Sequence, residues 1–373
     1  MIRFISPPIL KKFWGKTCLL RIDLNAKPGR EKKFLRVEAV MPTIKTLLKN
    51  RNKVVILSHR GRPTTKTDSK SSLRPFVPIL SRRLGKRVAF VSDFRLPDAG
   101  EVFLLENLRF WKEEEKNDAK FAKKLASLGD FYVNDAFAVS HRKDASVSAI
   151  TRHLPSYGGL LLKKEIENLD LAAKKARKPF VVVIGGAKVG DKLGIMSYLW
   201  KKADCFLLGS GPAATFFAAK GYPIGDSLVD RRSIPKIRKF IGSKKVILPL
   251  DVEMKDKRIL DIGPGTQRHY SEMIRKARTI IWSGPVGMFE KKGFSDGTKA
   301  IWMAMLKNKK ARIVIGGGET LASLSLIRNS MSLIPKNVFL STGGGAMLEY
   351  LSGKKLPGIA ALERASLAKG GKL

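Results

Sequence analysis

The stretch FVVVIGGAKVGDK, residues 180–192, predicts the fold of the second half of the chain. Its first five residues are apolar and mostly β-branched, which is typical of a buried strand. Two glycines follow, where a backbone can turn sharply or approach another group closely. Lys188 and Lys192 then lie four residues apart and bring positive charge to the end of the strand. This order of residues indicates a strand that ends at an anion-binding site.

The same pattern recurs through the second half. Six apolar runs end in glycine, proline or small polar residues, at 180–186, 205–211, 245–252, 279–285, 312–318 and 337–342. Five of their ends are rich in glycine, and we expect a helix to start after each: GGAK (185–188), GSGPAAT (209–215), SGPVG (283–287), GGGET (316–320) and TGGGA (342–346). Backbone N–H groups at helix starts attract anions. The second half is therefore predicted to bind a polyphosphate and a flat base.

The first half alternates in the same way. Strand-like runs lie at 17–24, 53–59, 88–92, 102–107 and 130–135, and helical spacing of apolar residues appears at 36–50 and 118–129. Such alternation favours parallel sheets flanked by helices, with binding sites outside the carboxyl ends of the strands. We predict an α/β protein of two doubly wound, Rossmann-like parallel-sheet domains, residues 1–160 and 161–351. A polar helix at 163–176 would join them.

Basic residues gather at the predicted strand ends of the first half, together with Asp23 and Asn25. The set is Asp23, Asn25, Arg36, His59, Arg60, Arg62, Arg109, His141 and Arg142. The arginine fork suits phosphate and carboxylate. Any one of these arginines could be an ordinary surface residue, and Asp23 and Asn25 could be turn formers. Their recurrence at strand ends instead predicts an anion cradle.

The chain carries 72 Lys and Arg against 32 Asp and Glu, a net charge of +40 in 373 residues. Residues 1–160 hold 33 basic and 15 acidic side chains, so the excess is spread over the chain. Such a field attracts nucleotides, phosphorylated metabolites and nucleic acid alike, and it is also compatible with solvated Lys/Arg-rich faces. No apolar run is long enough for a transmembrane helix, and the start of the chain lacks the features of a signal peptide. Cys18 and Cys205 lie in apolar runs, which favours buried thiols in a reducing cytosol.

Two common nucleotide motifs do not fit. In GAKVGDK, Asp191 follows the second glycine, where a P-loop needs lysine. GSGPAA (209–214) matches G-x-G-x-x-A, but no other dinucleotide feature accompanies it. The site is predicted to be of neither kind.

Taken in order, the blocks RIDLN, LSHRGRP, LLENLRF, VNDAFAVSHR, IGGAKVGDK, LLGSGPAATF, LDIGP, WSGPVGMFE, IGGGET and STGGGAMLEYLSGKKLPGIAAL resemble phosphoglycerate kinase from about residue 17 to 362. The resemblance implies two domains joined by a hinge helix, with 352–373 packing back on the N-terminal domain. It implies a glycolytic phosphotransferase with a carboxyl group as acceptor, which moves a phosphoryl group reversibly between 1,3-bisphosphoglycerate and ADP to give 3-phosphoglycerate and ATP, with Mg²⁺. A cytoplasmic monomer is also implied.

The resemblance also implies residue roles. Phosphoglycerate would be held by Asp23, Asn25, Arg36, His59, Arg60, Gly61, Arg62, Arg109 and Arg142. The nucleotide would be held by Gly186, Lys188, Lys192, Gly209, Gly211, Gly287, Glu290, Gly317, Gly318, Glu319 and Thr320, with Glu319 at the metal. Arg36, Lys192 and the amides of Gly343, Gly344 and Gly345 would serve the transferring phosphoryl group.

Four departures from the usual family pattern involve five positions. Glu319 replaces aspartate, Ser283 replaces the asparagine of W-N-G-P, Ser210 replaces the middle glycine of G-G-G, and Lys143 with Asp144 replaces A-H. Two rival functions are a weakened relative that mainly binds nucleotide and a nucleic-acid-binding protein. Since no nucleic-acid motif is found, binding of that kind would be unspecific and lost in salt. The final GKL resembles a peroxisomal address only loosely.

Overall fold

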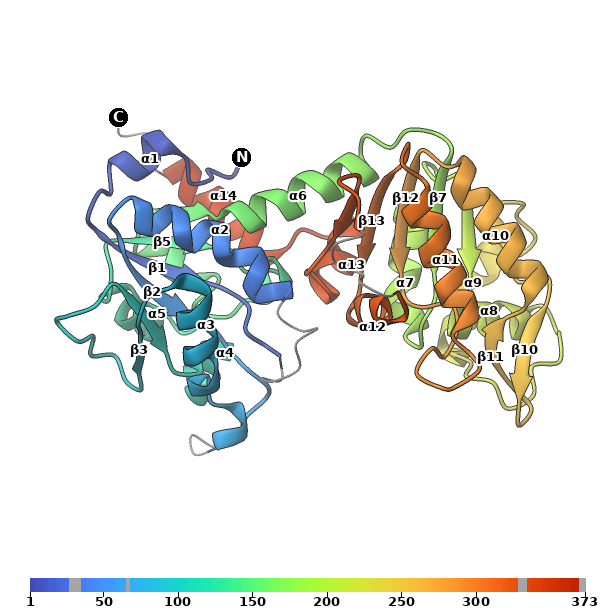
Figure 1. Cartoon of the computed structure of the whole chain (residues 1–373), viewed down its shortest axis with the longest axis horizontal. Coiled ribbons are helices and arrows are strands. Elements are labelled where there is room, and N and C mark those ends of the chain that lie inside the picture. The colour runs from blue at the N-terminus through green and yellow to red at the C-terminus, as the bar shows by residue number, and fades with distance from the viewer. Residues whose placement is uncertain (27–34, 65–67, 328–333, 369–373) are drawn as a thin grey trace. The chain divides into compact units, whose positions relative to one another are not determined.

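The computed structural model describes residues 1–26, 35–64, 68–327 and 334–368. The chain divides into two compact units. Unit 1 comprises Met1–Ile166 and Lys355–Leu373, and unit 2 comprises Glu167–Lys354. Each unit holds one six-stranded sheet with its own hydrophobic core. The predicted α/β class with two parallel sheets is confirmed (Figure 1).

The sheet of unit 1 is parallel throughout, in the order β3-β4-β2-β1-β5-β6. Its strands are β1 (Thr17–Arg21), β2 (Lys53–Leu57), β3 (Val88–Val91), β4 (Val102–Leu105), β5 (Phe131–Asn134) and β6 (Ser156–Gly158). Five of them lie in the predicted apolar runs. The three-residue β6 was missed because its sequence, SYG, contains no apolar run. The strand order reverses between β1 and β5, which places the predicted ligand side beside the carboxyl ends of these two strands.

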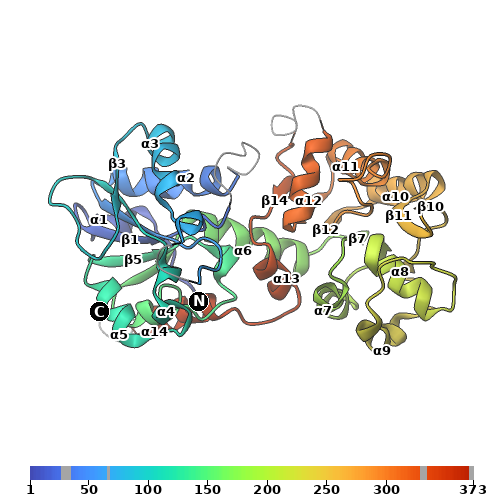
Figure 2. The same ribbon diagram turned by 90° about the horizontal axis from the view of Figure 1, so that it is seen from below.

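Helices cover both faces of this sheet (Figure 2). The helices of unit 1 are α1 (Pro7–Lys11), α2 (Leu35–Lys49), α3 (Val77–Leu84), α4 (Lys112–Glu115), α5 (Ala119–Ala126) and α14 (Pro357–Ala368). Val37, Val40 and Ile44 of α2 are buried in one core with alternate residues of the strands, as the 3.6-residue spacing of this segment predicts. The C-terminal helix α14 contacts β6, and Gly358 N donates to Ser140 O over 2.8 Å.

The sheet of unit 2 is also parallel, in the order β14-β13-β12-β7-β8-β9. The strands are β7 (Phe180–Ile184), β8 (Cys205–Leu208), β9 (Val246–Ile247), β12 (Thr279–Ser283), β13 (Arg312–Gly316) and β14 (Val338–Leu340). This order has the doubly wound form, with its reversal between β7 and β12. Both are fully buried apolar strands, as expected at the centre of such a sheet.

Residues 245–252 were predicted as one strand, and this is wrong. The segment is divided into the short β9 and the start of a separate antiparallel hairpin, β10 (Val252–Lys255) with β11 (Arg258–Ile262). Pro249 lies between the two pieces and has no N–H to donate to a ladder. At the hairpin turn, Asp256 and Lys257 have positive φ angles of 51° and 56°.

The helices of unit 2 are α7 (Val189–Leu199), α8 (Ser210–Ala219), α9 (Ile234–Ile237), α10 (Pro264–Lys276), α11 (Asp296–Lys307), α12 (Gly318–Ala322) and α13 (Gly345–Leu351). Tyr270 of α10 and Trp302 of α11 are fully buried against the strands, and α7 packs against α13. Figure 2 shows these two pairs on opposite faces of the sheet. A helix follows four of the five glycine-rich strand ends. The expectation fails at 283–287, where a turn follows and the next helix starts at Asp296.

The joining helix α6 spans Leu160–Ala173, three residues earlier than the predicted 163–176. Its start is fixed within unit 1 by the buried Asp135, which accepts a hydrogen bond from Leu162 N over 2.9 Å. The helix ends before the pair Lys178–Pro179 and the start of β7. The polar residues that suggested the range lie mainly in its middle and end, whereas its first turn, LLL, is apolar.

Candidate active site

The predicted anion cradle of unit 1 begins after β1. Arg36 Nη1 lies 2.6 Å from Asp23 Oδ2 and donates to Asn25 O over 3.0 Å. Asn25 Oδ1 in turn accepts from Gly61 N over 2.9 Å, which links this loop to the one after β2. Asp23 and Asn25 therefore orient Arg36 and Gly61, in addition to forming the turn (Asn25 N to Asp23 Oδ1, 2.8 Å).

Asn107 connects the loop after β2 to the loop after β4. Its Oδ1 accepts from the backbone N–H groups of Arg60 and Arg109, both over 3.1 Å, and its Nδ2 donates to Arg60 O over 2.7 Å. Arg109 Nη1 then donates to Gly61 O over 2.6 Å. Sequence reasoning missed Asn107, although an asparagine before LRF carries the signal of a cap at a short helix.

Arg109 and Arg142 share a carboxylate. Arg109 Nε lies 3.3 Å and Arg142 Nη1 lies 4.0 Å from Glu115 Oε1. Burial lowers the pKa of Arg109, and the neighbouring charge of Arg142 lowers it further. Asp144, one of the departures from the family pattern, is buried in the same group. Burial raises its pKa, and Arg21, Arg109 and Arg142 oppose this.

The other residues predicted for this cradle differ in exposure. His59 is 1% exposed, whereas Arg62 lies exposed at the surface. Arg60 is half-buried, and its Nη1 donates to Ser72 O over 2.9 Å. His59 contacts the buried Arg21, and the charges of Arg36, Arg109 and Arg142 act on its ring. Hydrogen bonds and ion pairs bring together Asp23, Asn25, Arg36, Gly61, Arg109 and Arg142. Within the described ranges, no hydrogen bond or ion pair joins Arg62 to them.

A pocket of about 640 Å³ opens at the predicted nucleotide side of unit 2. Its walls are the loops after β7, β8 and β12 and the start of β11, so it lies at the reversal of the strand order. The predicted residues that line it are Gly186, Gly211, Gly287, Glu290 and Glu319. Ala214, Leu228, Leu260 and Met288 supply apolar walls, which suits a flat base.

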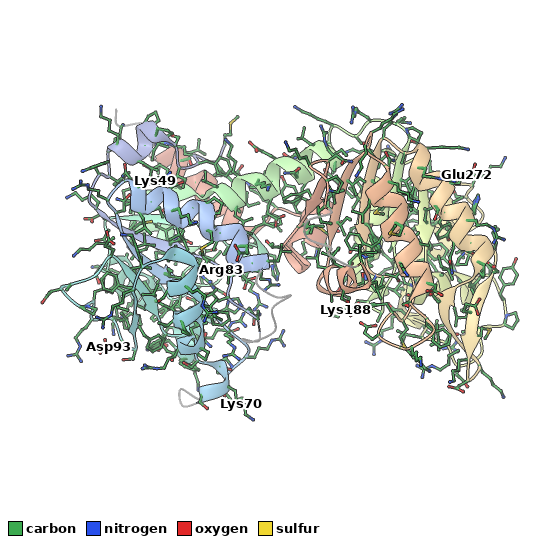
Figure 3. The ribbon with its side chains drawn as sticks, viewed as in Figure 1. Lys49, Lys70, Arg83, Asp93, Lys188 and Glu272 are labelled. Atoms are coloured by element: carbon green, nitrogen blue, oxygen red, sulfur yellow. The ribbon has the colours of Figure 1, made fainter. Side chains whose placement is uncertain are left out.

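Lys192 and Glu319 both approach Gly186. A Cβ placed on Gly186 would lie 3.0 Å from Lys192 Nζ and 3.1 Å from Glu319 Oε2, and its φ of 76° also favours glycine. Lys192 is 6% exposed. Burial lowers its pKa, and the charge of Glu319 opposes this. Lys188 precedes α7 and is exposed on unit 2, where Figure 3 labels it.

The glycines at this edge have two different roles. Gly209 and Gly287 allow close packing, since a Cβ on Gly209 would lie 2.6 Å from Val286 Cβ and one on Gly287 would clash with Asp261. Gly318 and Gly344 instead border open space. Gly317 and Gly344 precede α12 and α13 with positive φ angles of 98° and 51°, which favour glycine.

Three polar residues near the pocket are engaged with the backbone or buried. Thr320 is buried, and its Oγ1 accepts from Gly284 N over 2.7 Å. Ser210 has a φ of 48° and donates from Oγ to Pro285 O over 3.1 Å. Ser283 is 2% exposed at the end of β12. Thr320, predicted to bind nucleotide, thus has its hydroxyl committed to the loop after β12.

Comparison with known proteins shows which family has this architecture. The family model described as "Phosphoglycerate kinase" matches residues 10–354. The phosphoglycerate kinase of Dictyoglomus turgidum is 40% identical over 94% of this chain and 96% of its own, and that of Moorella thermoacetica is 39% identical over 93% and 96%. The solved structure from Coxiella burnetii has a TM-score of 0.82 at 35% identity and covers 97% of this chain and 99% of its own. The Pyrococcus horikoshii structure has the same TM-score at 31% identity, over 98% and 100%.

The fold and these relatives define a kinase built from two α/β units. More narrowly, the chain belongs to the phosphoglycerate kinase family, and its function is reversible phosphoryl transfer between 1,3-bisphosphoglycerate with ADP and 3-phosphoglycerate with ATP. Within the described ranges, no helix is long and apolar enough to cross a membrane.

Proposed function

We propose that unit 1 binds the phosphoglycerate and unit 2 binds the nucleotide. The arginine cluster at the carboxyl edge of the first sheet supports the first half of this proposal. Asp23, Asn25, Arg36, His59, Arg60, Gly61, Arg62, Arg109 and Arg142 form the substrate site. The joining of three loops by Asn25 and Asn107 is the single observation that carries it, because the hydrogen bonds hold the arginines in place before the anion arrives.

The nucleotide site is the pocket of unit 2. Its apolar walls hold the base, Glu290 takes the ribose hydroxyls, and Lys188 and Lys192 contact the phosphates. The glycines of the site are Gly186, Gly209, Gly211, Gly287, Gly317 and Gly318. Gly318 borders open space, whereas Gly209 and Gly287 make room for Val286 and Asp261, and Thr320 acts through the loop that it anchors. The pocket volume of about 640 Å³ is within the usual range for small-ligand sites.

Mg²⁺ binds with the nucleotide at Glu319. In the described part of the chain, no three His, Cys, Asp or Glu side chains group into a metal site. A single exposed carboxylate fits magnesium, which takes its other ligands from phosphate oxygens and water. When bound, the ion neutralises phosphate charge. Glu319 Oε2 would face the nucleotide, since it approaches the same point as Lys192 Nζ at the pocket wall.

The chain's own residues would catalyse the transfer by position and charge. A carboxylate oxygen of 3-phosphoglycerate attacks the γ-phosphorus of ATP, and the bond to the bridging oxygen of ADP breaks, without a covalent enzyme intermediate. Arg36 and Lys192 neutralise the charge of the moving phosphoryl group, and the backbone N–H groups of Gly344 and Gly345 add donors. The N–H of Gly343, which was predicted to act with them, already donates to Ser341 Oγ over 3.1 Å. The enzyme acts as a monomer in the cytoplasm.

Arg36→Ala tests this proposal. In a coupled assay with ATP and 3-phosphoglycerate, we expect the wild type to turn over and Arg36→Ala to lose about 3 kcal/mol of transition-state stabilisation, roughly a hundredfold or more in kcat. Arg83→Ala is the matched control, because it removes an exposed arginine paired with Glu38 over 2.8 Å and should change kcat little. Near wild-type turnover of Arg36→Ala would contradict the role of Arg36.

The rival function is that of a weakened relative that mainly binds nucleotide. Arg36, Lys188 and Lys192 are all present, which supports an active enzyme. Absence of turnover in the wild type, with tight ADP binding by calorimetry, would favour the rival.

A further inference from the structure

Arg21 is a buried arginine that the proposed mechanism does not use. It is the last residue of β1 and is fully buried in an otherwise apolar strand. Each of its three side-chain nitrogens has a partner. Nε donates to Ser146 Oγ over 2.8 Å, Nη1 donates to Ile22 O over 2.5 Å, and Nη2 lies 3.2 Å from His59 Nδ1. An arginine in a strand core is costly unless it is paired in this way.

Ser146 and Glu114 hold Arg21 from the other side. Glu114 is fully buried, and its two oxygens accept from Ser146, Oε1 from the hydroxyl over 2.5 Å and Oε2 from the backbone N–H over 3.0 Å. Because the serine proton is directed to Glu114, its oxygen is left to accept from Arg21 Nε. A chain of hydrogen bonds therefore runs from Glu114 through Ser146 and Arg21 to Nδ1 of His59.

The contact decides where the proton of His59 lies. A guanidinium group has donors and no acceptor, so the Nδ1 that it contacts must be the accepting nitrogen. The proton of a neutral imidazole is then on Nε2. That atom is buried and has no hydrogen-bond partner among the residues that the structure describes. A buried N–H without a partner is unfavourable until an acceptor reaches it.

The surroundings also keep the imidazole uncharged. His59 faces Arg21 from β1, Arg36 from α2, Arg109 from the loop after β4 and Arg142 from the loop after β5. Burial first, and these four positive charges in addition, hold the pKa of His59 well below its ordinary value. A positive charge on the ring would be opposed from every side.

We propose that Arg21 is a positioning residue, which fixes His59 in the neutral tautomer with its proton on Nε2, so that this nitrogen donates to an anionic oxygen of the phosphoglycerate. The inference rests on the proposed function for the identity of the anion. The assignment of the tautomer rests only on the contact between Arg21 and His59. The ring recognises its ligand as a neutral donor, and the surrounding arginines supply the charge.

Nitrogen-15 NMR of the histidine rings tests the tautomer in the unliganded protein. The chain has only four histidines, and the signal of His59 is assigned by its loss in His59→Gln. We expect a protonated Nε2 and an unprotonated Nδ1, and a ring that stays neutral as the pH falls through the ordinary pKa of histidine. A proton on Nδ1, or a charged ring at pH 6, would overturn the proposal without any substituted protein.

Substitution of Arg21 separates positioning from bulk stability. In Arg21→Met the ring should lose its tautomer preference and the Kd for 3-phosphoglycerate should rise about tenfold, whereas the Kd for ADP is unchanged. Arg21→Lys still offers a donor and should retain the Nε2–H form. Tyr132→Phe is the matched control, because it removes a buried 2.7 Å hydrogen bond to Ser146 O and leaves Arg21 and His59 in place.

The outcomes also distinguish this proposal from the proposed function. An unaltered tautomer and 3-phosphoglycerate affinity in Arg21→Met would overturn the positioning role. A weakening as large in Tyr132→Phe would do the same, since it would show a loss of stability alone. Absence of 3-phosphoglycerate binding in the wild type would instead overturn the proposed function, and the tautomer would be judged by the spectrum alone.

Discussion

At the scale of single residues, Glu319 is, with Ser210, one of two departures from the family pattern that line the proposed nucleotide pocket. The carboxylate is exposed and follows Gly318 in the first turn of α12, where the positive end of a helix favours an acid even without a ligand. The positive charge of Lys192, whose Nζ approaches the same point, is a second reason for an acid at this position. A test of metal binding by Glu319 therefore has to separate that role from the effect of the helix end and from the effect of Lys192.

Magnesium titration of turnover makes this separation. We expect Glu319→Gln to need about tenfold more Mg²⁺ for half-maximal turnover, because the amide lacks the charge that a hard cation prefers. Glu319→Asp should match or improve on the wild type. Metal-free ADP binding is the internal control and should change little in either variant. Superimposable magnesium curves for wild type and Glu319→Gln would mean that this carboxylate does not serve the metal.

Residues of the site differ in how far the sequence alone could predict them. Arg36, His59, Arg109 and Lys192 follow predicted strand ends, so topology alone brings them to the carboxyl edges of their sheets, where the ligands are proposed to bind. Arg21 and Asn107 could not be assigned in this way, since their roles depend on which loops meet in three dimensions. The signal for Arg21 was present as a charge inside the apolar run TCLLR, and only the structure gives its partners.

At the scale of elements, α8 begins with a residue in a conformation that favours glycine. Ser210 has a φ of 48°, which costs about 1 kcal/mol for a residue with a side chain. Its Oγ recovers part of this by donating to Pro285 O over 3.1 Å. The family's usual glycine would avoid the strain and lose the hydrogen bond.

A pair of variants measures the backbone strain at Ser210 and the contribution of its hydrogen bond to the free energy of unfolding. Ser210→Ala keeps the strain and loses the hydrogen bond, so we expect it to lower the free energy of unfolding by about 1 kcal/mol. Ser210→Gly loses the same bond and relieves the strain, so it should be more stable than Ser210→Ala by about 1 kcal/mol. Urea denaturation gives both values. Equal stability of the two variants would show that the backbone at this helix start is unstrained.

Asp261 fastens β11 to the start of α11. Its Oδ2 accepts from Gly297 N and its Oδ1 accepts from Ile262 N, both over 2.9 Å. It is 3% exposed, and the lack of side chains at Gly287 and Gly297 leaves room for its carboxyl group. Burial raises the pKa of Asp261 to about 7. The folded protein therefore holds this proton at a pH where the unfolded chain, with a pKa of about 3.9, has lost it.

The consequence is a pH-dependent stability of known sign. Because the folded pKa is the higher one, the contribution of Asp261 is fully present below about pH 4 and is lost as the pH rises through about 7. It amounts to a few kcal/mol at most. Asp261→Asn should flatten the fall in the free energy of unfolding between about pH 4 and 7, measured by urea denaturation at several pH values. An unchanged slope in this variant would contradict the raised pKa.

Strands could be predicted where the apolar runs are long. The predictions failed for strands that are short or exposed and at a glycine-rich turn. β7, β12 and β13 lie in the middle of the second sheet and were recognised from largely apolar five-residue runs, of which only Arg312 is not fully buried. β6 and the β10–β11 hairpin are short or exposed, so periodicity carries little signal for them. The turn at 283–287 shows that glycine marks the end of a strand without determining whether a helix or a turn comes next.

At the scale of the whole molecule, the net charge of +40 acts on folding and on binding in opposite directions. Lysine and arginine side chains project from the surfaces of both units, as the nitrogen tips in Figure 3 show. Like charges at this density repel one another and oppose the compact state, while the same field raises the local concentration of anionic substrates. Both effects are screened by salt, over a Debye length of about 10 Å at 0.1 M.

Added salt should therefore both stabilise the fold and weaken substrate binding. Between about 0.05 and 0.5 M KCl, we expect the free energy of unfolding to rise by about 1 kcal/mol or more as self-repulsion is screened, and the KM values for ATP and 3-phosphoglycerate to rise several-fold. Binding to a single-stranded oligonucleotide should fall more steeply, since it depends on counterion release without a specific site. A neutral osmolyte at equal osmolality is the control and should leave both KM values unchanged. KM values that stay flat while oligonucleotide binding disappears would show that the local arginine cluster and lysine pair, and not the field of the whole molecule, capture the substrates.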